Sequence, residues 1–167
     1  MRAATAADAA QMAAIYRPFV EQTCVSFELE APGADELAAR VASAQRQHAW
    51  LVAVDADGDV LGYAYGSPHR ARAAYRYSTE VSAYVHESSR GRGVGRALYL
   101  RLFDELAARG YCNALAGVTM PNDPSVAFHE ALGFTGVGVY RRVGLKFGEW
   151  RDVAWFERRL RERPLDA

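Results

Sequence analysis

A glycine-rich turn, Arg90-Gly91-Arg92-Gly93-Val94-Gly95, joins a segment patterned like a β-strand directly to a segment patterned like an α-helix. Glycines in such a turn let backbone N–H groups approach a ligand, and the N-terminus of the following helix adds partial positive charge. Arg90, Arg92 and Arg96 add full positive charge. The turn therefore predicts a strand–helix unit with a site for a phosphate or pyrophosphate group. A flexible basic turn without a ligand is the alternative.

Two other phosphate-binding motifs do not fit this turn. A Rossmann GxGxxG motif would need glycine at position 96 or 98, where Arg96 and Leu98 stand. A Walker A loop would need Gly-Lys-Ser/Thr, and the one lysine of the chain, Lys146, is far away in the sequence. A dinucleotide fold and a P-loop fold are therefore not expected.

The strand before the turn carries an unexpected carboxylate. With a period of two, Glu80, Ser82 and Tyr84 lie on one face of this strand. A strand that leads into a phosphate-binding turn is expected to be central, and a partly buried carboxylate there suits a general base. The alternative is a structural ion pair of Glu80 with Arg72 or Arg76.

A third signal lies in residues 122–134. Asn122 or Asp123 can cap a short helix that has Pro124 in its first turn. His129 is a polar residue within this mostly apolar helix. It is either a structural, hydrogen-bonding histidine or a residue with a chemical role.

Apolar periodicity predicts one domain over residues 1–167. Gly-rich and polar breaks separate the elements, and Asp57-Gly58 predicts a hairpin. The order of elements favours an α/β (α+β) domain with a mixed sheet. We expect helices over 8–20, 35–46, 93–109 and 123–132, strands over 50–55, 60–66, 78–86, 114–119, 137–143 and 152–160, and ordered loops over 67–77 and 144–150.

Composition narrows the function classes. Lysine plus arginine number 20 and aspartate plus glutamate number 20, so the formal net charge is zero and bulk charge does not favour a nucleic-acid partner. No apolar run approaches the ~20 residues of a membrane span, so no membrane partner is expected. Cys24 and Cys112 are expected to be free thiols in the cytoplasm. The histidines show no metal-ligand spacing, so no metal is expected.

Together, the three segments resemble the GNAT superfamily of acetyl-CoA-dependent N-acetyltransferases. The turn is similar to the Arg/Gln-x-x-Gly-x-Gly/Ala pyrophosphate loop, and residues 122–134 are similar to the Asn…(Tyr/His)-Glu-x-x-Gly-Phe helix. From about residue 15 to residue 160 the chain further resembles the phosphinothricin/methionine sulfoximine N-acetyltransferase family. The more specific stretches are those around Glu80 and Lys146: Ser67-Pro68, Arg72, Ala74-Tyr75-Arg76, Thr79-Glu80, Tyr84-Val85-His86 and Val143-Gly144-x-Lys146-Phe147-Gly148-x-Trp150-x-Asp152-Val153.

This resemblance implies a GNAT fold, with a central mixed, mostly antiparallel sheet flanked by helices, and a role for each matching residue. Glu80 would be the general base, and His129 would protonate the departing thiolate. The acetyl-CoA site would comprise the backbone of Ala83, Tyr84 and Val85 for the pantetheine arm, Arg90, Gly91, Arg92, Gly93, Val94, Gly95 and Arg96 for the pyrophosphate, and Asn122 for the pantetheine region. The acceptor pocket would comprise Phe27, Arg72, Tyr75 and Ser82.

The implied reaction is acetylation of the α-amine of a small glutamate or glutamine analogue such as L-phosphinothricin, methionine sulfoximine or methionine sulfone. Arg70, Arg72 and Arg76 are candidates to pair with its carboxylate or phosphinate. Alternatives are another small amine or a peptide N-terminus as acceptor, or a non-catalytic CoA-binding module. The family resemblance also implies a homodimer, for which the apolar segment 153–156 is a candidate interface.

Overall fold

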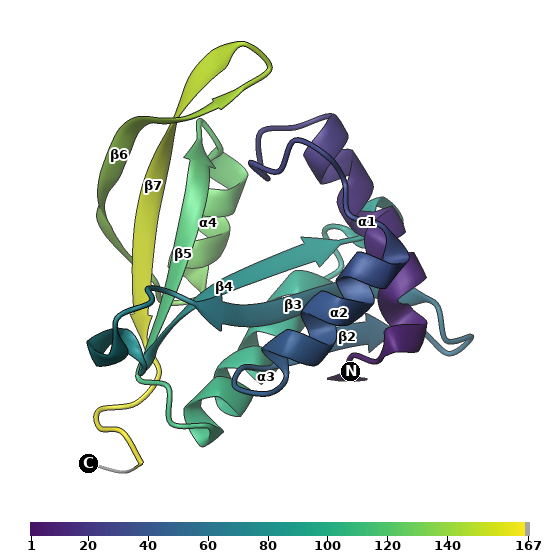
Figure 1. Ribbon diagram of the computed structural model, residues 1–167, viewed down its shortest axis with the longest axis horizontal. Coiled ribbons are helices and arrows are strands. Elements are labelled where there is room, and N and C mark those ends of the chain that lie inside the picture. The colour runs from purple at the N-terminus through teal and green to yellow at the C-terminus, as the bar shows by residue number, and fades with distance from the viewer. Residues whose placement is uncertain (166–167) are drawn as a thin grey trace.

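In the computed structural model, which describes residues 1–165, one sheet has the strand order β1-β2-β3-β4-β5-β7-β6 (Figure 1). Its strands are β1 (Arg2–Ala3), β2 (Trp50–Val54), β3 (Val60–Pro68), β4 (Ser78–Val85), β5 (Asn113–Met120), β6 (Thr135–Lys146) and β7 (Glu149–Arg159). The α-helices are α1 (Ala9–Glu21), α2 (Ala34–Ala44), α3 (Val94–Ala108) and α4 (Asp123–Ala131). Short 3-10 turns are η1 (Ala6–Asp8), η2 (Ala73–Tyr75) and η3 (Glu87–Ser89).

The β4–β5 pair is the one parallel pair among the described strands, so the expected mixed, mostly antiparallel sheet is confirmed. This pairing joins only Ser78–Glu80 to Asn113–Leu115. Beyond it the two strands diverge, as the directions of β4 and β5 in Figure 1 show. The backbone edge of β4 that faces β5 is therefore free of ladder partners after Glu80, close to the glycine-rich turn.

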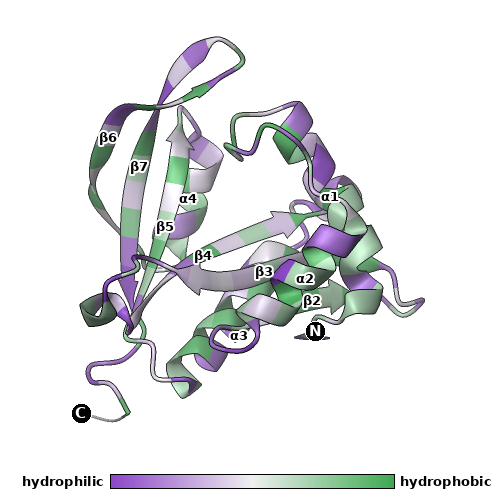
Figure 2. Ribbon diagram, viewed as in Figure 1, coloured by the Kyte–Doolittle hydropathy of each residue, from purple (hydrophilic) through white to green (hydrophobic). Residues whose placement is uncertain are grey.

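Alternating side chains divide the interior into two cores. On one face, α3 and α4 cover a core that includes Val81 and Leu102. On the other face, α1 and α2 cover a core that includes Tyr63 and Tyr84. Because successive residues of a strand point to opposite faces, β4 contributes Val81 to one core and Tyr84 to the other. In Figure 2, hydrophobic segments run along these helices and the central strands.

The predicted elements agree with the structure except at the two ends of the sheet. The two-residue strand β1 carries no periodic signal and was not predicted. The predicted loop 144–150 is wrong, because β6 and β7 pair as far as Lys146 and Glu149. Phe147 and Gly148 make the turn with positive φ values of 52° and 76°. Phe-Gly is not one of the Asn-Gly or Asp-Gly pairs that mark such hairpins in a sequence.

Two further observations bear on possible partners. The segment 153–156 is the predicted dimer surface, but Ala154 and Phe156 are buried within the chain because their side chains pack into the α3/α4 core. Among the described residues, no helix is long and apolar enough to cross a membrane.

Candidate active site

The glycine-rich turn opens onto a cleft of about 470 Å³ beside the second half of β4. Its walls come from α1, β4, the turn and the first half of α4. The lining residues are Phe19, Ala83, Val85, Ser89, Arg90, Gly91, Gly93, Val94, Gly95, Arg96, Pro124, Ser125 and Phe128. The structure thus brings together most of the predicted acetyl-CoA residues. The side chain of Tyr84 packs into the α1/α2 core, as the alternation along β4 requires, so its predicted contact with the pantetheine arm would be made by its backbone.

The conformation of the turn explains its glycines. Gly91 and Gly93 have φ values of 73° and 80°, which side chains with a Cβ rarely adopt. Gly93 is the N-cap of α3, so the free N–H groups of the first helical turn face the cleft region. Gly95 has ordinary backbone angles, and a Cβ there would lie 3.4 Å from Val85 and 3.5 Å from Phe128.

The arginines of the turn are available to an anion. Arg90, Arg92 and Arg96 are exposed, and none of the ion pairs within residues 1–165 involves them. The Arg90 guanidinium lies 5.0 Å from the ring centroid of Phe19 at the mouth of the cleft. Donors without carboxylate partners around a helix N-terminus are what a pyrophosphate requires.

A second cleft, of about 350 Å³, lies between the α1–α2 loop and the far end of the sheet. It is lined by Val25, Phe27, Arg70, Gly117, Thr119, Tyr140, Val143, Val153 and Trp155. Phe27 therefore forms part of the wall of this cleft. This mostly apolar cleft with one guanidinium is suited to a small acceptor that carries a negative group.

Glu80 stands beside this second cleft. Its side chain is 30% exposed, and its Oε1 lies 2.9 Å from His69 Nδ1 and 3.9 Å from Arg70 Nη1. The alternative of an ion pair with Arg72 or Arg76 is wrong in its partners, because the residues within ion-pair distance of the Glu80 carboxylate are His69 and Arg70. Because Arg70 lines the second cleft, the Glu80 carboxylate lies 3.9 Å from a side chain in the wall of that cleft.

Two of the predicted acceptor residues, Arg72 and Tyr75, do not line the second cleft with Phe27. With Arg76 they line a separate cavity of about 240 Å³, and Arg70 lines both this cavity and the second cleft. The structure therefore brings Arg70, but not Arg72 or Tyr75, into the lining of the second cleft together with Phe27. Ser82 is half-buried on the same face of β4 as Glu80 and does not line either cleft.

The buried Lys146 fixes the loop that carries Phe27. Its side chain crosses from β6 and donates hydrogen bonds of 2.6 Å to the main-chain oxygens of Val20 and Ser26. Burial lowers the pKa of this ammonium group. Ser26 Oγ lies 2.6 Å from the hydroxyl of Tyr16, whose ring meets Tyr84 edge-on at 4.6 Å. One chain of contacts thus connects β6, the loop and β4.

His129 is enclosed rather than exposed to a cleft. It is 6% exposed, its Nδ1 donates to the main-chain oxygen of Ser125 at 2.7 Å, and its Nε2 lies 3.4 Å from the Tyr99 hydroxyl. Burial lowers its pKa, and the bond to Ser125 partly opposes this. These contacts agree with the structural alternative. Asn122 caps α4 by accepting from the Ser125 N–H at 3.2 Å, and it does not line the first cleft.

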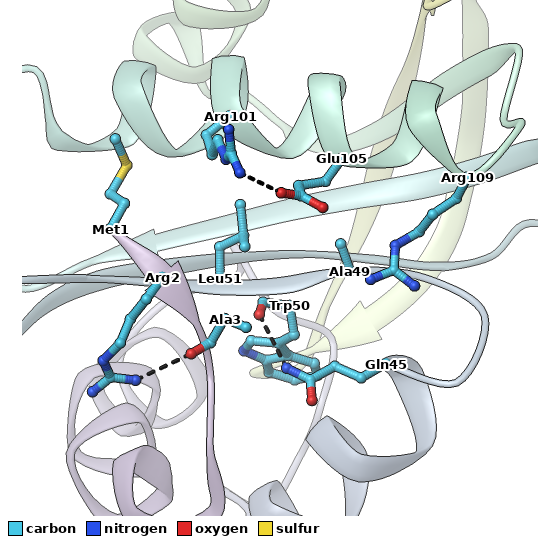
Figure 3. Close-up of a pocket in the computed structure, with 10 residues that line it drawn as sticks. All are labelled: Met1, Arg2, Ala3, Gln45, Ala49, Trp50, Leu51, Arg101, Glu105 and Arg109. Atoms are coloured by element: carbon cyan, nitrogen blue, oxygen red, sulfur yellow. Dashed lines mark hydrogen bonds and ion pairs between the residues drawn. The ribbon is translucent and has the colours of Figure 1, made fainter.

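A larger cavity of about 540 Å³ lies at the opposite edge of the sheet, between β1, β2 and α3 (Figure 3). Its acidic residue, Glu105, is already paired with Arg101 at 2.6 Å, and the two lie side by side on α3. None of the predicted site residues lines it. Within residues 1–165 there is also no group of three histidine, cysteine or acidic side chains placed to hold a metal ion.

The comparison with family models decides the class. Residues 1–155 match the model described as "Acetyltransferase (GNAT) domain". The chain belongs to the GNAT acetyltransferase family. The expected fold and enzyme class are therefore confirmed, and GNAT enzymes use acetyl-CoA as their co-substrate.

Relatives within the family are similar over nearly the whole chain. A phosphinothricin N-acetyltransferase of Streptomyces coelicolor is 42% identical over 87% of this chain and 87% of its own length. An L-methionine sulfoximine/L-methionine sulfone acetyltransferase of Salmonella typhimurium is 33% identical over 97% and 95%. The crystal structure of a phosphinothricin acetyltransferase from Sinorhizobium meliloti in complex with AcCoA superposes with a TM-score of 0.93, at 34% identity over 99% of this chain and 92% of that chain.

Sequence reasoning missed several residues around the clefts. His69 contacts Glu80 from the loop that was described only as basic and ordered. Gly117 and Trp155 pair across β5 and β7 and line the second cleft together. A glycine in the middle of strand β5 is a signal of close approach that could have marked this position.

Proposed function

We propose that this GNAT enzyme transfers the acetyl group of acetyl-CoA to the α-amine of a small glutamate or glutamine analogue, such as L-phosphinothricin, methionine sulfoximine or methionine sulfone. One observation carries the proposal. Ala83 and Val85 line the cleft of the glycine-rich turn, while Glu80, three residues earlier on β4, stands beside the second cleft. Three strand residues span about 10 Å, so one strand connects the proposed donor and acceptor sites.

The proposed chemistry begins at Glu80. An α-ammonium group attacks only after it loses a proton, and a carboxylate beside the acceptor cleft can accept that proton. The free amine then attacks the thioester carbonyl. The unpaired backbone edge of β4 is the natural source of N–H groups for the pantetheine arm and for the developing oxyanion.

The departing thiolate needs a proton, and His129 remains our candidate donor. Its polar contact with a residue of the first cleft is to Ser125, which lines that cleft and whose Oγ lies 3.5 Å from His129 Nδ1. We therefore propose that the proton passes from His129 to the thiolate by way of the Ser125 hydroxyl. For Asn122 we propose that it contributes to the acetyl-CoA site by capping α4 and so placing Ser125.

Charge at the second cleft favours an acidic acceptor. Arg70 lines this cleft, and it can pair with a carboxylate or phosphinate. We assign Arg72 and Tyr75 to the outer part of the acceptor site, next to Arg70, and Ser82 to its inner part on β4. The names of the Streptomyces and Salmonella relatives support acceptors of this class. A polyamine would instead meet positive charge.

We also propose that the enzyme is a cytoplasmic homodimer without a nucleic-acid or membrane partner. Support for the dimer comes from exposed apolar side chains on β6, on the turn to β7 and at the start of β7, where Figure 2 shows hydrophobic segments between hydrophilic ones. The exposed apolar residues there are Val137, Val139, Tyr140, Val143, Leu145, Phe147 and Trp150. Such a patch is typical of an interaction surface. Light scattering should give twice the chain mass, and the double variant Val139→Glu/Leu145→Glu should give the chain mass.

The function is tested by acetyl-CoA turnover with a panel of acceptors. The panel comprises L-phosphinothricin, methionine sulfoximine, methionine sulfone, spermidine and a peptide with a free N-terminus. We expect kcat/KM for at least one of the three amino-acid analogues to exceed that for spermidine and for the peptide by about a hundredfold or more, a difference of roughly 3 kcal/mol in transition-state binding. Preference for spermidine or the peptide would contradict the proposal.

A further inference from the structure

His69 contacts the proposed base directly. Its Nδ1 lies 2.9 Å from Oε1 of Glu80, and the two side chains are 12% and 30% exposed. Ser67 pairs with Glu80 across the β3–β4 ladder, so His69 follows two residues beyond the position opposite Glu80. The register of two neighbouring strands therefore sets the distance between imidazole and carboxylate.

The imidazole ring is itself held from two sides. The ring of Tyr75 meets it edge-on at 5.7 Å, and the ring of Trp155 does so at 6.1 Å. Trp155 lines the second cleft, our proposed acceptor cleft. Tyr75 lines the cavity of about 240 Å³ that also contains Arg72 and Arg76, which we call the basic cavity. His69 thus stands in the partition between the two, with its orientation limited by an aromatic ring on either side.

We propose that His69 is a positioning residue for Glu80. A carboxylate has no proton to donate, so the contact requires a proton on His69 Nδ1 that is donated to Oε1 of Glu80. With Oε1 engaged, Oε2 is left to accept the proton of the acceptor amine. This inference rests on the proposed function, because that function makes Glu80 the base. The inference adds His69 as the residue that orients this base.

The second cation near Glu80 cannot replace this contact. Arg70 lies 3.9 Å from the same oxygen, beyond hydrogen-bond distance, and its side chain is 44% exposed. Glutamate otherwise has several rotatable bonds, and a base must come within about 3 Å of the proton it removes. A displacement of about 1 Å can cost about a hundredfold in rate. Loss of the His69 hydrogen bond should therefore lower kcat.

The decisive variants separate the hydrogen bond from the packing. His69→Phe keeps an aromatic ring between Tyr75 and Trp155 but removes the donor, and His69→Gln restores an N–H donor without the ring. We expect His69→Phe to lower kcat about ten- to a hundredfold, with the KM for acetyl-CoA unchanged, and His69→Gln to recover a large part of the loss. Tyr111→Phe is the matched control, because it alters the same basic cavity without touching Glu80.

A double-mutant cycle with Glu80→Gln tests whether His69 acts through Glu80. If it does, His69→Phe should have less than about a threefold further effect on kcat in the Glu80→Gln background. Thermal unfolding and acetyl-CoA affinity of each variant establish that the fold and the first cleft are intact.

Three results would overturn the inference. They are wild-type kcat in His69→Phe, an equal loss of kcat in His69→Phe and His69→Gln, and an equal effect of His69→Phe in both backgrounds. In each of these the wild-type enzyme remains active on its acceptor, so the proposed function stands. A wild-type enzyme that acetylates none of the panel would instead overturn the proposed function and the role of His69 with it.

Discussion

Phe27 of the α1–α2 loop lies directly against Gly144 of β6, so closely that a Cβ at position 144 would overlap the aromatic ring. These residues are far apart in the sequence, and Phe27 also lines the second cleft, which we propose as the acceptor site. Lys146, two residues further along β6, ties the same loop by its hydrogen bonds to Val20 and Ser26. The position of Phe27 in the wall of the second cleft therefore depends on a loop that β6 holds in place.

Gly144→Ala should displace Phe27 and disturb acceptor binding. We expect the KM for the acceptor to rise about tenfold, equivalent to about 1.4 kcal/mol, with the acetyl-CoA affinity unchanged. Gly136→Ala is a control in the same strand, because a Cβ there meets nothing within 4 Å. Unchanged acceptor KM in Gly144→Ala would show that Phe27 does not shape the cleft.

Glu80→Gln should remove the base while keeping its shape. We expect a loss of about a hundredfold or more in kcat/KM at neutral pH, with acetyl-CoA affinity nearly unchanged. The loss should shrink as the pH approaches the ordinary pKa of the amine, because free amine no longer needs the base. An equal loss at every pH would indicate that Glu80 orients the ammonium group instead, and normal activity would exclude both roles.

Gly95→Asp should abolish acetyl-CoA binding without unfolding the chain. Position 95 has ordinary backbone angles, and a Cβ there would make ordinary contacts with Val85 and Phe128, so the effect of a new carboxylate is not confused with backbone strain. Its negative charge would lie at the N-terminus of α3, where a pyrophosphate is expected. Calorimetric titration should detect no binding for Gly95→Asp and near-normal binding for Gly95→Ala. Wild-type affinity in Gly95→Asp would remove the turn from the acetyl-CoA site.

His129→Phe tests the candidate proton donor. We expect a partial loss of about ten- to a hundredfold in kcat, because the CoA thiol is acidic enough to leave slowly without help. Ser125→Ala should reproduce part of this loss, since Ser125 lies between His129 and the cleft. Wild-type kcat in His129→Phe, measured under saturating substrates, would leave His129 with a purely structural role.

Acidification should weaken the fold through two buried histidines. Burial lowers the pKa of His48 and of His129 below the ordinary value of 6.5, with a smaller contribution from Arg109 at His48. The unfolded chain therefore binds protons at these positions more readily than the native state does. Their stabilisation is complete above about pH 6.5 and is lost as the pH falls through 6.5 toward the lowered native values. Thermal unfolding should show Tm falling between pH 7 and pH 5, with a flatter profile in His48→Gln/His129→Gln.

The sequence by itself determined the strand–turn–helix unit at Arg90–Gly95 and most of the central elements, because these depend on local backbone preference and apolar periodicity. Gly93 can adopt the positive φ that the turn uses without steric cost, and the alternation along a strand puts Glu80 on the same face as Ser82, wherever the rest of the chain lies. Motif spacing also sufficed to identify the GNAT family.

Only the tertiary structure decided which side chains meet at the site. Nothing local indicates that His69, rather than Arg72 or Arg76, contacts Glu80, because the register of β3 against β4 determines that neighbour. In the same way, Lys146 reaches Val20 and Ser26 only after β6 has joined the sheet on the far side of β7. Such contacts depend on strand pairing between segments distant in sequence, which residue-by-residue preferences do not specify.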